Sequence, residues 1–373
     1  MKDYKALNVF MGDHRVGTLA TTTDHLVAFE YDAEWLRDGF SISPMSLPLQ
    51  KGVYVPKRYD PFDGLFGVFS DSLPDGWGRL LVDRLLLKEG KKPAEVDALN
   101  RLAIVGSSGM GALSYHPEIQ LAIGNTDLTL DEIANQCKAI FETNESENLD
   151  EIFLMGGSSG GARPKVNYEF DQEEWIVKFP SSIDQKDIGV QEYEYSICAQ
   201  KCGIHMTETR LIPSKISSGF FATKRFDRRK EKCIHMASVS ALLETSHRIP
   251  NLDYHILMQL TLKLTNDYQQ TMQLYRRMCF NVFAHNRDDH SKNFSFLYDD
   301  ESKSWVLAPA YDLTYSNSIG GEHATTVDGN GSDPGMRELL TVANDIKLDQ
   351  NKAKNIALEI EEEVQCSLRR WLK

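Results

Sequence analysis

The chain has 373 residues, of which 41% are hydrophobic and 25% charged, as in an ordinary globular protein with a substantial core. Acidic residues outnumber basic residues by 54 to 41, and the formal net charge at pH 7 is −13. A surface of that sign repels nucleic acid as a whole, so direct DNA binding would need a local basic patch. We interpret the basic cluster at residues 224–232 as a solvated loop or a segment near a nucleotide.

The six cysteines are scattered without a Cys-x-x-Cys pair, and their spacing fits neither a zinc site nor a disulfide framework. We therefore expect reduced thiols, as in cytoplasmic proteins. The N-terminus lacks the apolar core of a signal peptide, and no run approaches 18 apolar residues. These features predict a soluble, cytoplasmic protein that does not enter a membrane.

The first part of the chain predicts a mixture of strands and helices. Short apolar stretches within residues 5–31 predict a β-hairpin or a small sheet. A helix is predicted to begin after Asp75, a candidate N-cap, and to end at Gly90, and a second helix is predicted over residues 130–142. The polar, acidic stretch 143–148 is the best candidate for a connection between domains.

A glycine- and serine-rich loop at residues 155–165 leads into a predicted strand, a polar turn and a second strand at 175–179. Glycines let backbone N–H groups approach phosphate oxygens, so residues 156–161 are candidates for phosphate binding. A similar stretch at 106–111 is followed by no lysine-bearing hairpin. We interpret that earlier stretch as structural.

Lys178 ends the second of these strands, and its apolar neighbours, such as Val177, are predicted to face the core. The following predicted helix carries Glu192 near its start and ends at Gly203. A strand lysine paired with a helix glutamate holds nucleotide phosphates in kinases. Lys178 is therefore either such a residue or a plain surface lysine.

The rest of the chain is mostly helical by periodicity, with helices predicted over residues 252–264, 266–284 and 350–372. The second of these leads directly into the segment His285-Asn286-Arg287-Asp288. The chain therefore ends in a helical region, and a short polar segment interrupts it.

Asp288, Asn293 and Asp312 stand at the spacing of a phosphoryl-transfer centre. In kinase-type sites an Asp orients the attacking hydroxyl, an Asn five residues later holds a metal ion, and an Asp on a nearby turn also binds metal. The hard oxygen ligands of Asn293 and Asp312 suit Mg²⁺. Asp289 and His290 would also fit a metal hydrolase, although further ligands at helical or strand spacing are not obvious.

Taken together, these motifs resemble the HipA family of bacterial serine/threonine kinases, the toxins of HipBA-type toxin–antitoxin systems. The resemblance extends over nearly the whole chain. The matching segments are the Leu-Pro-x-Gly-like stretch 69–77, Gly106 with 111–113, the glycine loop through Lys165, residues 225–228, Asp288 to Asn293, and residues 307–312.

The resemblance implies an α+β, bilobal protein-kinase-like fold with an N-terminal mixed α/β subdomain over residues 1–142. A kinase-like catalytic domain would follow over residues 150–373. Its N-lobe would cover about 150–227, and its mainly helical C-lobe would cover about 228–373.

The resemblance also implies a role for each matched residue. Asp288 would be catalytic, and Asn293 and Asp312 would bind Mg²⁺. Lys178 would contact the ATP phosphates, supported by an ion pair with Glu192. The ATP-binding set would comprise Gly160, Gly161, Ala162, Lys165, Lys178, Lys224, Phe226, Asp227 and His290.

Within that set, Asp227 and His290 would lie near the ribose, whereas backbone groups around Lys224 and Phe226 would meet the adenine. Family members can phosphorylate a serine of their own glycine loop, and this modification shuts the enzyme down. In this chain the matching serine is Ser158 or its neighbour, which is Ser159. Arg163 and Pro164 replace the Gln-Glu of many relatives, so regulation of this loop would differ.

The implied activity is that of an ATP- and Mg²⁺-dependent serine/threonine protein kinase acting on a protein target, such as a translation component, and on itself. The implied partner is a small HipB-like helix-turn-helix antitoxin, through which alone the chain would meet DNA. Two alternatives stay open. One is a non-catalytic pseudokinase that acts as a co-repressor with an antitoxin, and the other is a small-molecule kinase of the aminoglycoside type.

Overall fold

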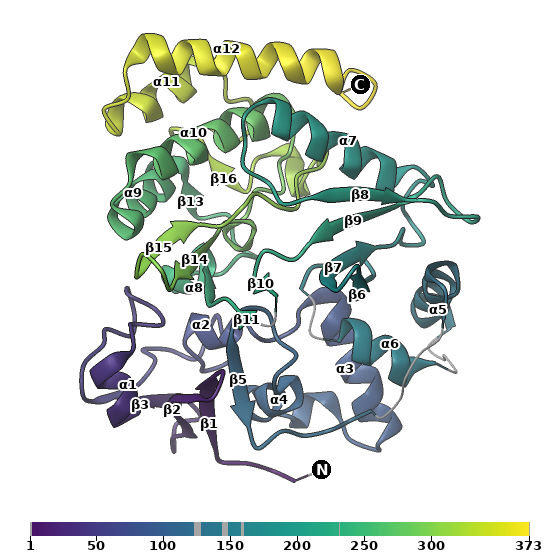
Figure 1. The fold of residues 1–373 in the computed structure, drawn as a ribbon, viewed down its shortest axis with the longest axis vertical. Helices are drawn as coiled ribbons and strands as arrows, with labels where there is room; N and C mark the ends of the chain where they lie inside the picture. Colours follow the sequence, from purple (N-terminus) through teal and green to yellow (C-terminus); the bar gives the residue numbers. More distant parts are fainter. Residues whose placement is uncertain (1, 123–127, 144–147, 158–159, 231, 373) are drawn as a thin grey trace. The chain divides into compact units, whose positions relative to one another are not determined.

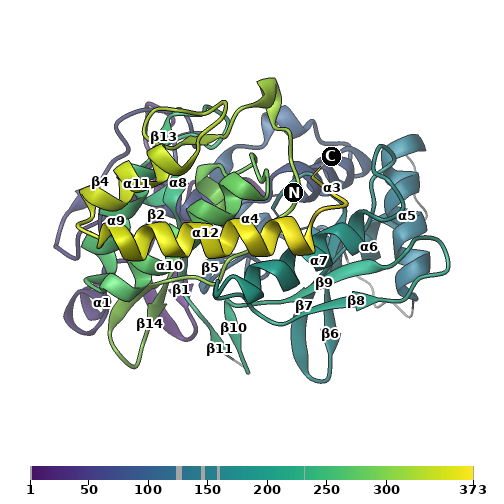
Figure 2. The same ribbon diagram turned by 90° about the horizontal axis from the view of Figure 1, so that it is seen from above.

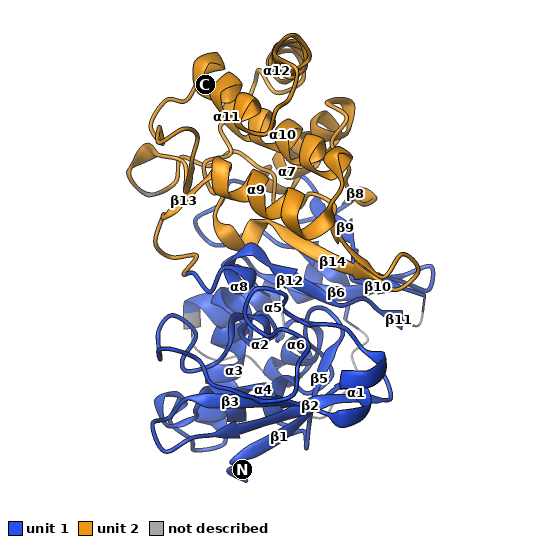
Figure 3. Ribbon diagram, turned by 90° about the vertical axis from the view of Figure 1, so that its left-hand side faces the viewer, with its two compact units in different colours: residues 1–186, 212–245 blue, residues 187–211, 246–373 orange. Residues whose placement is uncertain are grey.

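The computed structural model describes residues 2–122, 128–143, 148–157, 160–230 and 232–372. The chain divides into two compact units, coloured separately in Figure 3. Unit 1 comprises residues 1–186 and 212–245, and unit 2 comprises residues 187–211 and 246–373. None of the helices in the described ranges combines the length and the apolar character needed to span a bilayer.

Unit 1 begins with a five-stranded sheet in the order β4-β3-β2-β1-β5. Figure 1 labels its strands β1, β2, β3 and β5. All of its neighbouring strands pair antiparallel, and alternate side chains such as Leu7 and Val9 are buried. The strands are β1 (Ala6–Met11), β2 (His14–Thr21), β3 (Val27–Tyr31), β4 (Val53–Tyr54) and β5 (Leu113–His116). The small sheet predicted within residues 5–31 is therefore confirmed.

The helices of unit 1 include the two that the sequence predicts, at α3 and α5. The helix α3 ends at Lys88, two residues before Gly90, and α5 extends to Thr143. The helices are α1 (Ala33–Asp38), α2 (Gly67–Ser70), α3 (Gly76–Lys88), α4 (Ala98–Val105), α5 (Leu130–Thr143), α6 (Leu149–Gly156) and α8 (Val239–Leu242), with a 3-10 turn at Pro93–Glu95. Residues 144–147, in the predicted interdomain connection, lie outside the described residues.

A second antiparallel sheet of unit 1 contains the hairpin that follows the glycine loop. Asp171 and Gln172 turn the hairpin with φ values of 54° and 64°, as a type I′ turn requires. Trp175 and Val177 are fully buried among side chains of α3, α5 and α6, so the predicted core face is confirmed. The strands of this sheet are β6 (Lys165–Phe170), β7 (Glu173–Lys178), β9 (Phe220–Lys224) and β8 (Thr209–Ile212), the last of which contains the boundary between the units. Three short strands come later in the chain, β10 (Arg228–Arg229), β11 (Lys232–Cys233) and β12 (Met236–Ser238).

Unit 2 is mainly helical, as predicted, and α12 lies along α10 and beside α11 (Figures 1 and 2). Its helices are α7 (Ile188–Lys201), α9 (Tyr254–Thr265), α10 (Tyr268–Phe283), α11 (Met336–Asp345) and α12 (Gln350–Ser367). Its strands are β13 (Leu252–Asp253), β14 (Ser295–Asp299), β15 (Ser304–Leu307) and β16 (Thr325–Thr326), with 3-10 turns at Ser291–Asn293 and Ile319–Gly321.

The helices α9 and α10 begin two residues later than the sequence predicts. Leu252 and Asp253 form β13, which pairs in parallel with β16, and the Asp253 side chain then caps α9. Asn266 ends α9 in the left-handed conformation, and Asp267 caps α10. Local capping chemistry therefore fixes the exact boundaries of these two helices.

Candidate active site

The segment after α10 presents Asp288 on a tightly held backbone in unit 2. The Asn286 N–H donates to Asn281 O at 3.0 Å, and the Arg287 carbonyl accepts from Ala324 N at 3.0 Å. The Asp288 side chain itself is 60% exposed. A carboxylate that solvent and substrate can reach thus stands on a fixed main chain, as a residue orienting a substrate hydroxyl requires.

Asn293 lies next to Asp288 and has a defined orientation. Its amide Nδ2 donates to the Asp288 carbonyl at 2.7 Å, so a metal ion at this residue would meet Oδ1. His290 caps the 3-10 turn between them, and its Nδ1 accepts from Lys292 N at 3.2 Å. The other ring nitrogen, Nε2, lies 3.9 Å from the Asp288 carboxylate. His290 is therefore placed beside the predicted catalytic group.

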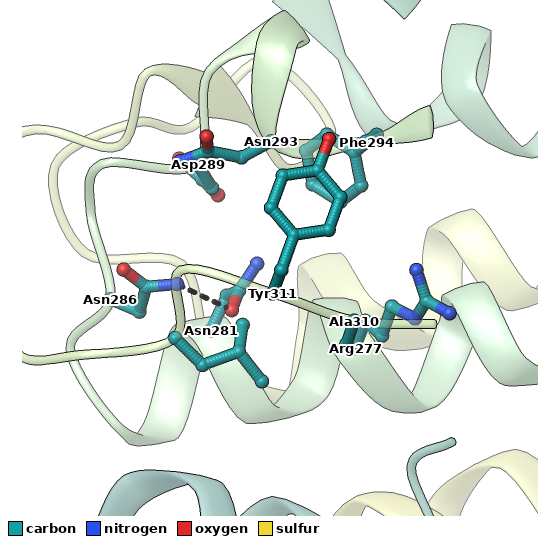
Figure 4. Close-up of a pocket in the computed structure, with 9 residues that line it drawn as sticks. Arg277, Asn281, Asn286, Asp289, Asn293, Phe294, Ala310 and Tyr311 are labelled. Atoms are coloured by element: carbon teal, nitrogen blue, oxygen red, sulfur yellow. Dashed lines mark hydrogen bonds between the residues drawn. The ribbon is translucent and has the colours of Figure 1, made fainter. Parts of the chain in front are cut away.

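The second motif, which carries Asp312, is tied to the first by Tyr311. The Tyr311 hydroxyl donates to the Lys292 carbonyl at 2.6 Å, and the Ser295 hydroxyl lies 2.6 Å from the Tyr311 hydroxyl oxygen. Figure 4 shows the Tyr311 ring reaching toward Asn293 and Phe294. The structure thus brings the residue before Asp312 against the residue before Asn293, within unit 2.

A small cavity of about 10 Å³, room for one water molecule, lies between these segments and α10 (Figure 4). Arg277 on its wall is 2% exposed, and burial lowers the pKa of its guanidinium to about 10. Its Nη2 donates to the Ala308 carbonyl at 2.5 Å, so α10 supports the segment that leads to Asp312. The cavity is lined by Arg277, Asn281, Asn286, Asp289, Asn293, Phe294, Ala310, Tyr311 and Leu313.

Sequence reasoning missed Arg277 and Asn281. Both lie on the buried side of α10, together with Leu274 and Met278. The available signal was a cation and an amide at helical spacing among apolar residues, which predicts buried polar groups that need partners.

In unit 1, Asp75, Trp77 and Lys165 hold the glycine loop. The Asp75 carboxylate accepts from the Gly161 N–H, and the Trp77 N–H donates to the Gly161 carbonyl at 2.9 Å. The Lys165 Nζ donates to the Gly160 carbonyl at 2.5 Å. Ala162 follows in the same loop and is exposed.

Asp75 occupies the N-cap position of α3, but its side chain makes no capping hydrogen bond. The prediction that Asp75 caps α3 is wrong in this respect, because the carboxylate turns to the glycine loop instead. The loop passes so close that a Cβ on Gly76 would lie 2.4 Å from the Gly161 carbonyl oxygen. A glycine is therefore required at position 76.

The phosphate-binding expectation is wrong for the first two glycines of residues 156–161. Gly156 is the last residue of α6, and the Gly157 N–H donates to Phe153 O at 2.7 Å. Helical hydrogen bonding thus occupies the N–H group that phosphate would need. Ser158 and Ser159 lie outside the described residues.

Lys165 and Lys178 stand directly opposite each other on β6 and β7. They therefore share the sheet face opposite to Val166 and Val177, which belong to the core. The two side chains therefore place positive charge on the same face of the sheet. The Lys178 Nζ also lies 5.5 Å from the centre of the Phe221 ring. This face of unit 1 suits a phosphate.

The next predicted residues to locate are Lys224 and Phe226, for the adenine, and Glu192, the predicted partner of Lys178. Lys224 forms an ion pair with Glu173, and the side chain of Phe226 is half-buried. Glu192 is 3% exposed on α7 and belongs to unit 2, whereas Lys178 belongs to unit 1. The ion pair between Lys178 and Glu192 stays a prediction.

Asp227 is fully buried in a network of arginines. Arg225 and Arg228 each donate to its Oδ2 at 2.8 Å, and so does the Gly111 N–H at 2.8 Å. Burial alone would raise the pKa of Asp227, but the two arginines outweigh burial and lower it. Arg228 also donates to the Gly109 carbonyl at 3.0 Å, which supports the structural interpretation of residues 106–111. A ribose contact of Asp227 stays a prediction.

The metal-hydrolase alternative gains no support. The carboxylate of Asp289 is buried and accepts from Tyr254, His323 and Thr325. Across the described part of the chain, no group of three His, Cys, Asp or Glu residues is arranged to hold a metal ion. Asn293 and Asp312 are two residues, one of them an amide, so this finding does not bear on them as predicted Mg²⁺ ligands.

The fold is similar to that of HipA in the solved structure "Shewanella oneidensis MR-1 Toxin Antitoxin System HipA, HipB and its operator DNA complex". The TM-score is 0.71 at 18% identity, over 98% of this chain and 90% of that chain. The chain thus has the α+β, protein-kinase-like fold of HipA, as predicted.

Family models match two parts of the sequence. The HipA N-terminal domain matches residues 7–116, and the HipA-like C-terminal domain matches residues 157–368. The chain belongs to the HipA family.

Two curated relatives come from Sinorhizobium fredii (strain NBRC 101917 / NGR234). The protein named "Putative kinase Y4dM" is 26% identical over 335 residues, which are 84% of this chain and 78% of that protein. The protein named "Putative kinase Y4mE" is 25% identical over 343 residues, which are 83% of this chain and 77% of that protein. The family and these relatives support a HipA-type kinase.

Proposed function

We propose that the protein is an ATP- and Mg²⁺-dependent serine/threonine protein kinase. It phosphorylates a protein target, such as a translation component, and a serine of its own glycine loop, Ser158 or Ser159. The observation that carries the proposal is the hydrogen bond from the Tyr311 hydroxyl to the Lys292 carbonyl, at 2.6 Å. This bond joins the segments of Asp288, Asn293 and Asp312, whose spacing is that of a phosphoryl-transfer centre.

In the proposed reaction, the substrate hydroxyl oxygen bonds to the γ-phosphorus of ATP while the bond from that phosphorus to the leaving ADP oxygen breaks. The hydroxyl proton passes to the Asp288 carboxylate. Mg²⁺, held by Asn293 Oδ1 and the Asp312 carboxylate, would offset the negative charge of the phosphates. Lys165 and Lys178, in unit 1, would contact ATP, and Lys178 would supply positive charge for its phosphates.

We also propose a HipB-like helix-turn-helix antitoxin as a partner, because the solved HipA structure similar to this fold is a complex with HipB and its operator DNA. The formal charge of −13 supports a division of labour in which the antitoxin contacts DNA. This chain would meet DNA only through that partner.

The test is incubation of the full chain with γ-labelled ATP and Mg²⁺. We expect self-labelling of the wild type and a loss of about 10²-fold or more in the Asp288→Ala variant. The control is Asp300→Ala, which removes another exposed carboxylate of unit 2, at the turn between β14 and β15. Labelling that persists in Asp288→Ala would refute the assigned role of Asp288.

The same experiment separates the alternatives. A pseudokinase co-repressor would transfer no label, yet it would still bind its antitoxin. With an aminoglycoside added as acceptor, a small-molecule kinase would place the label on that low-mass acceptor and leave proteins unlabelled. Growth arrest on expression that Asp312→Ala relieves would further distinguish a catalytic toxin from a co-repressor.

A further inference from the structure

Asp289 follows the proposed catalytic residue, but its side chain turns into the core of unit 2 and is 0% exposed. Its carboxylate accepts from the Tyr254 hydroxyl at 2.9 Å, from His323 Nδ1 at 3.0 Å and from the Thr325 N–H at 3.1 Å. Its backbone carbonyl accepts from the Thr325 hydroxyl at 2.5 Å. Four hydrogen bonds therefore fix the residue that follows Asp288.

The partners of this carboxylate are unusual for a buried acid. Within the described ranges no lysine or arginine pairs with Asp289, and His323 is the one titratable base in contact with it. A buried carboxylate costs free energy that directional hydrogen bonds must offset, and an apolar side chain would fill the space without that cost. The arrangement favours exact placement of the chain over stability.

The hydrogen-bond network of Asp289 also includes Asn286, which lies on the N-terminal side of Asp288. The Tyr254 hydroxyl accepts from Asn281 Nδ2 at 2.9 Å, and the Asn281 Oδ1 accepts from Asn286 Nδ2 at 3.0 Å, the dashed line in Figure 4. Asn286 and Asp289 are thus both anchored, from α10 and α9 respectively. Asp288 lies between these two anchors.

We propose that Asp289, Tyr254 and His323 are positioning residues for the catalytic carboxylate of Asp288. This inference rests on the proposed kinase function. The three side chains are buried in unit 2, so they act on the transfer step through the backbone of Asp288. A displacement of about 1 Å at a reacting group costs about 10²-fold in rate, and a single lost bond in a shared network costs less.

The test compares two fully buried tyrosines of unit 2. Tyr254→Phe removes the hydroxyl that contacts Asp289, whereas Tyr275→Phe removes a hydroxyl that contacts the Ala353 carbonyl on α12 at 3.4 Å. We expect Tyr254→Phe to lower kcat about ten-fold or more, with KM for ATP and the folded fraction unchanged. Tyr275→Phe should leave kcat and KM unchanged.

Equal kcat values in the two variants, or a change confined to KM for ATP, would overturn the inference. If Tyr254→Phe does not fold, Thr325→Val removes only the hydroxyl that contacts the Asp289 carbonyl and is expected to lower kcat in the same way. An unchanged kcat in Thr325→Val would then count against the inference. A wild type that transfers no phosphate refutes the proposed function itself, and the positioning role falls with it.

Discussion

Two buried aspartates, Asp227 in unit 1 and Asp289 in unit 2, show how one residue type serves two purposes. Each side chain is 0% exposed. Asp227 is held by the cations Arg225 and Arg228, whereas Asp289 is held by a hydroxyl, a backbone N–H and a histidine.

The difference lies in what each network connects. The arginines of Asp227 also contact Gly109, Gly111 and Glu174, so they join three stretches that are far apart in sequence. The donors of Asp289 converge on a single short segment next to Asp288. The first network therefore stabilises a fold, and the second fixes the geometry of one loop.

The largest loss of stability should come from breaking the ionic network around Asp227. Asp227→Asn leaves Arg225 and Arg228 buried without a carboxylate between them, and we expect the free energy of unfolding to fall by about 3–5 kcal/mol. Denaturant titration measures this change. Glu174→Gln is the matched control, because its 44% exposed side chain pairs with the same arginines. Equal losses in both variants would contradict the role assigned to Asp227.

The acid dependence of stability should come from His235 rather than Asp227. Burial lowers the pKa of His235 to about 4, so the unfolded chain binds a proton more readily than the folded one. The contribution of His235 to the free energy of unfolding is fully present above the unfolded pKa of about 6.5. About 3 kcal/mol of it is lost as the pH falls to about 4. Asp227, whose pKa is lowered, loses its contribution only at more acidic pH.

The His235→Gln variant tests whether His235 causes this loss of stability at acidic pH. Glutamine can still donate to the Ile42 carbonyl that His235 Nε2 contacts at 2.8 Å, but it does not bind a proton. We expect the free energy of unfolding of the variant to depend less on pH between about 6.5 and 4. A slope as steep as that of the wild type would show that another group causes the acid dependence.

A smaller loss of stability is expected when the network around Asp289 is broken. Asp289→Asn keeps the size of the side chain and one acceptor oxygen, and the remaining donors are not arginines. We expect the free energy of unfolding to fall by about 1–3 kcal/mol, as for other unsatisfied buried hydrogen-bonding groups. Thermal denaturation checks this value. A loss as large as that of Asp227→Asn would remove the distinction between the two networks.

The smallest effect is expected for an exposed ion pair. Lys224 and Glu173 are 33% and 41% exposed, so Lys224→Met should change the free energy of unfolding by less than about 1 kcal/mol. If Lys224 meets the nucleotide through its backbone alone, the affinity for ATP should also stay unchanged. Calorimetric titration with ATP would reveal a side-chain contact as weaker binding.

Sequence patterns were sufficient where the relevant contacts are local. Helical periodicity located α10 and α12, and motif spacing selected Asp288 and Asn293, which a 2.7 Å hydrogen bond joins in the structure. The glycine-loop hairpin was recognised by its turn and its alternating strand residues.

Contacts between distant segments were not predictable in this way. Asp75 has the local signature of a helix cap, but its carboxylate binds Gly161, 86 residues away. The bond between Tyr254 and Asp289 joins residues 35 apart, and periodicity shows which side chains are buried without showing which pair together. Tertiary partners override local preference at these positions.

The most direct test of the central claim is a double-mutant cycle on Asn293→Ala and Asp312→Asn, measured as the Mg²⁺-dependent rate of phosphate transfer. If both side chains serve one metal ion, each single variant should lose about 10²-fold or more, and the double variant should be little worse than the poorer single variant. Losses that multiply, or single variants that keep the rate of the wild type, would contradict a shared site.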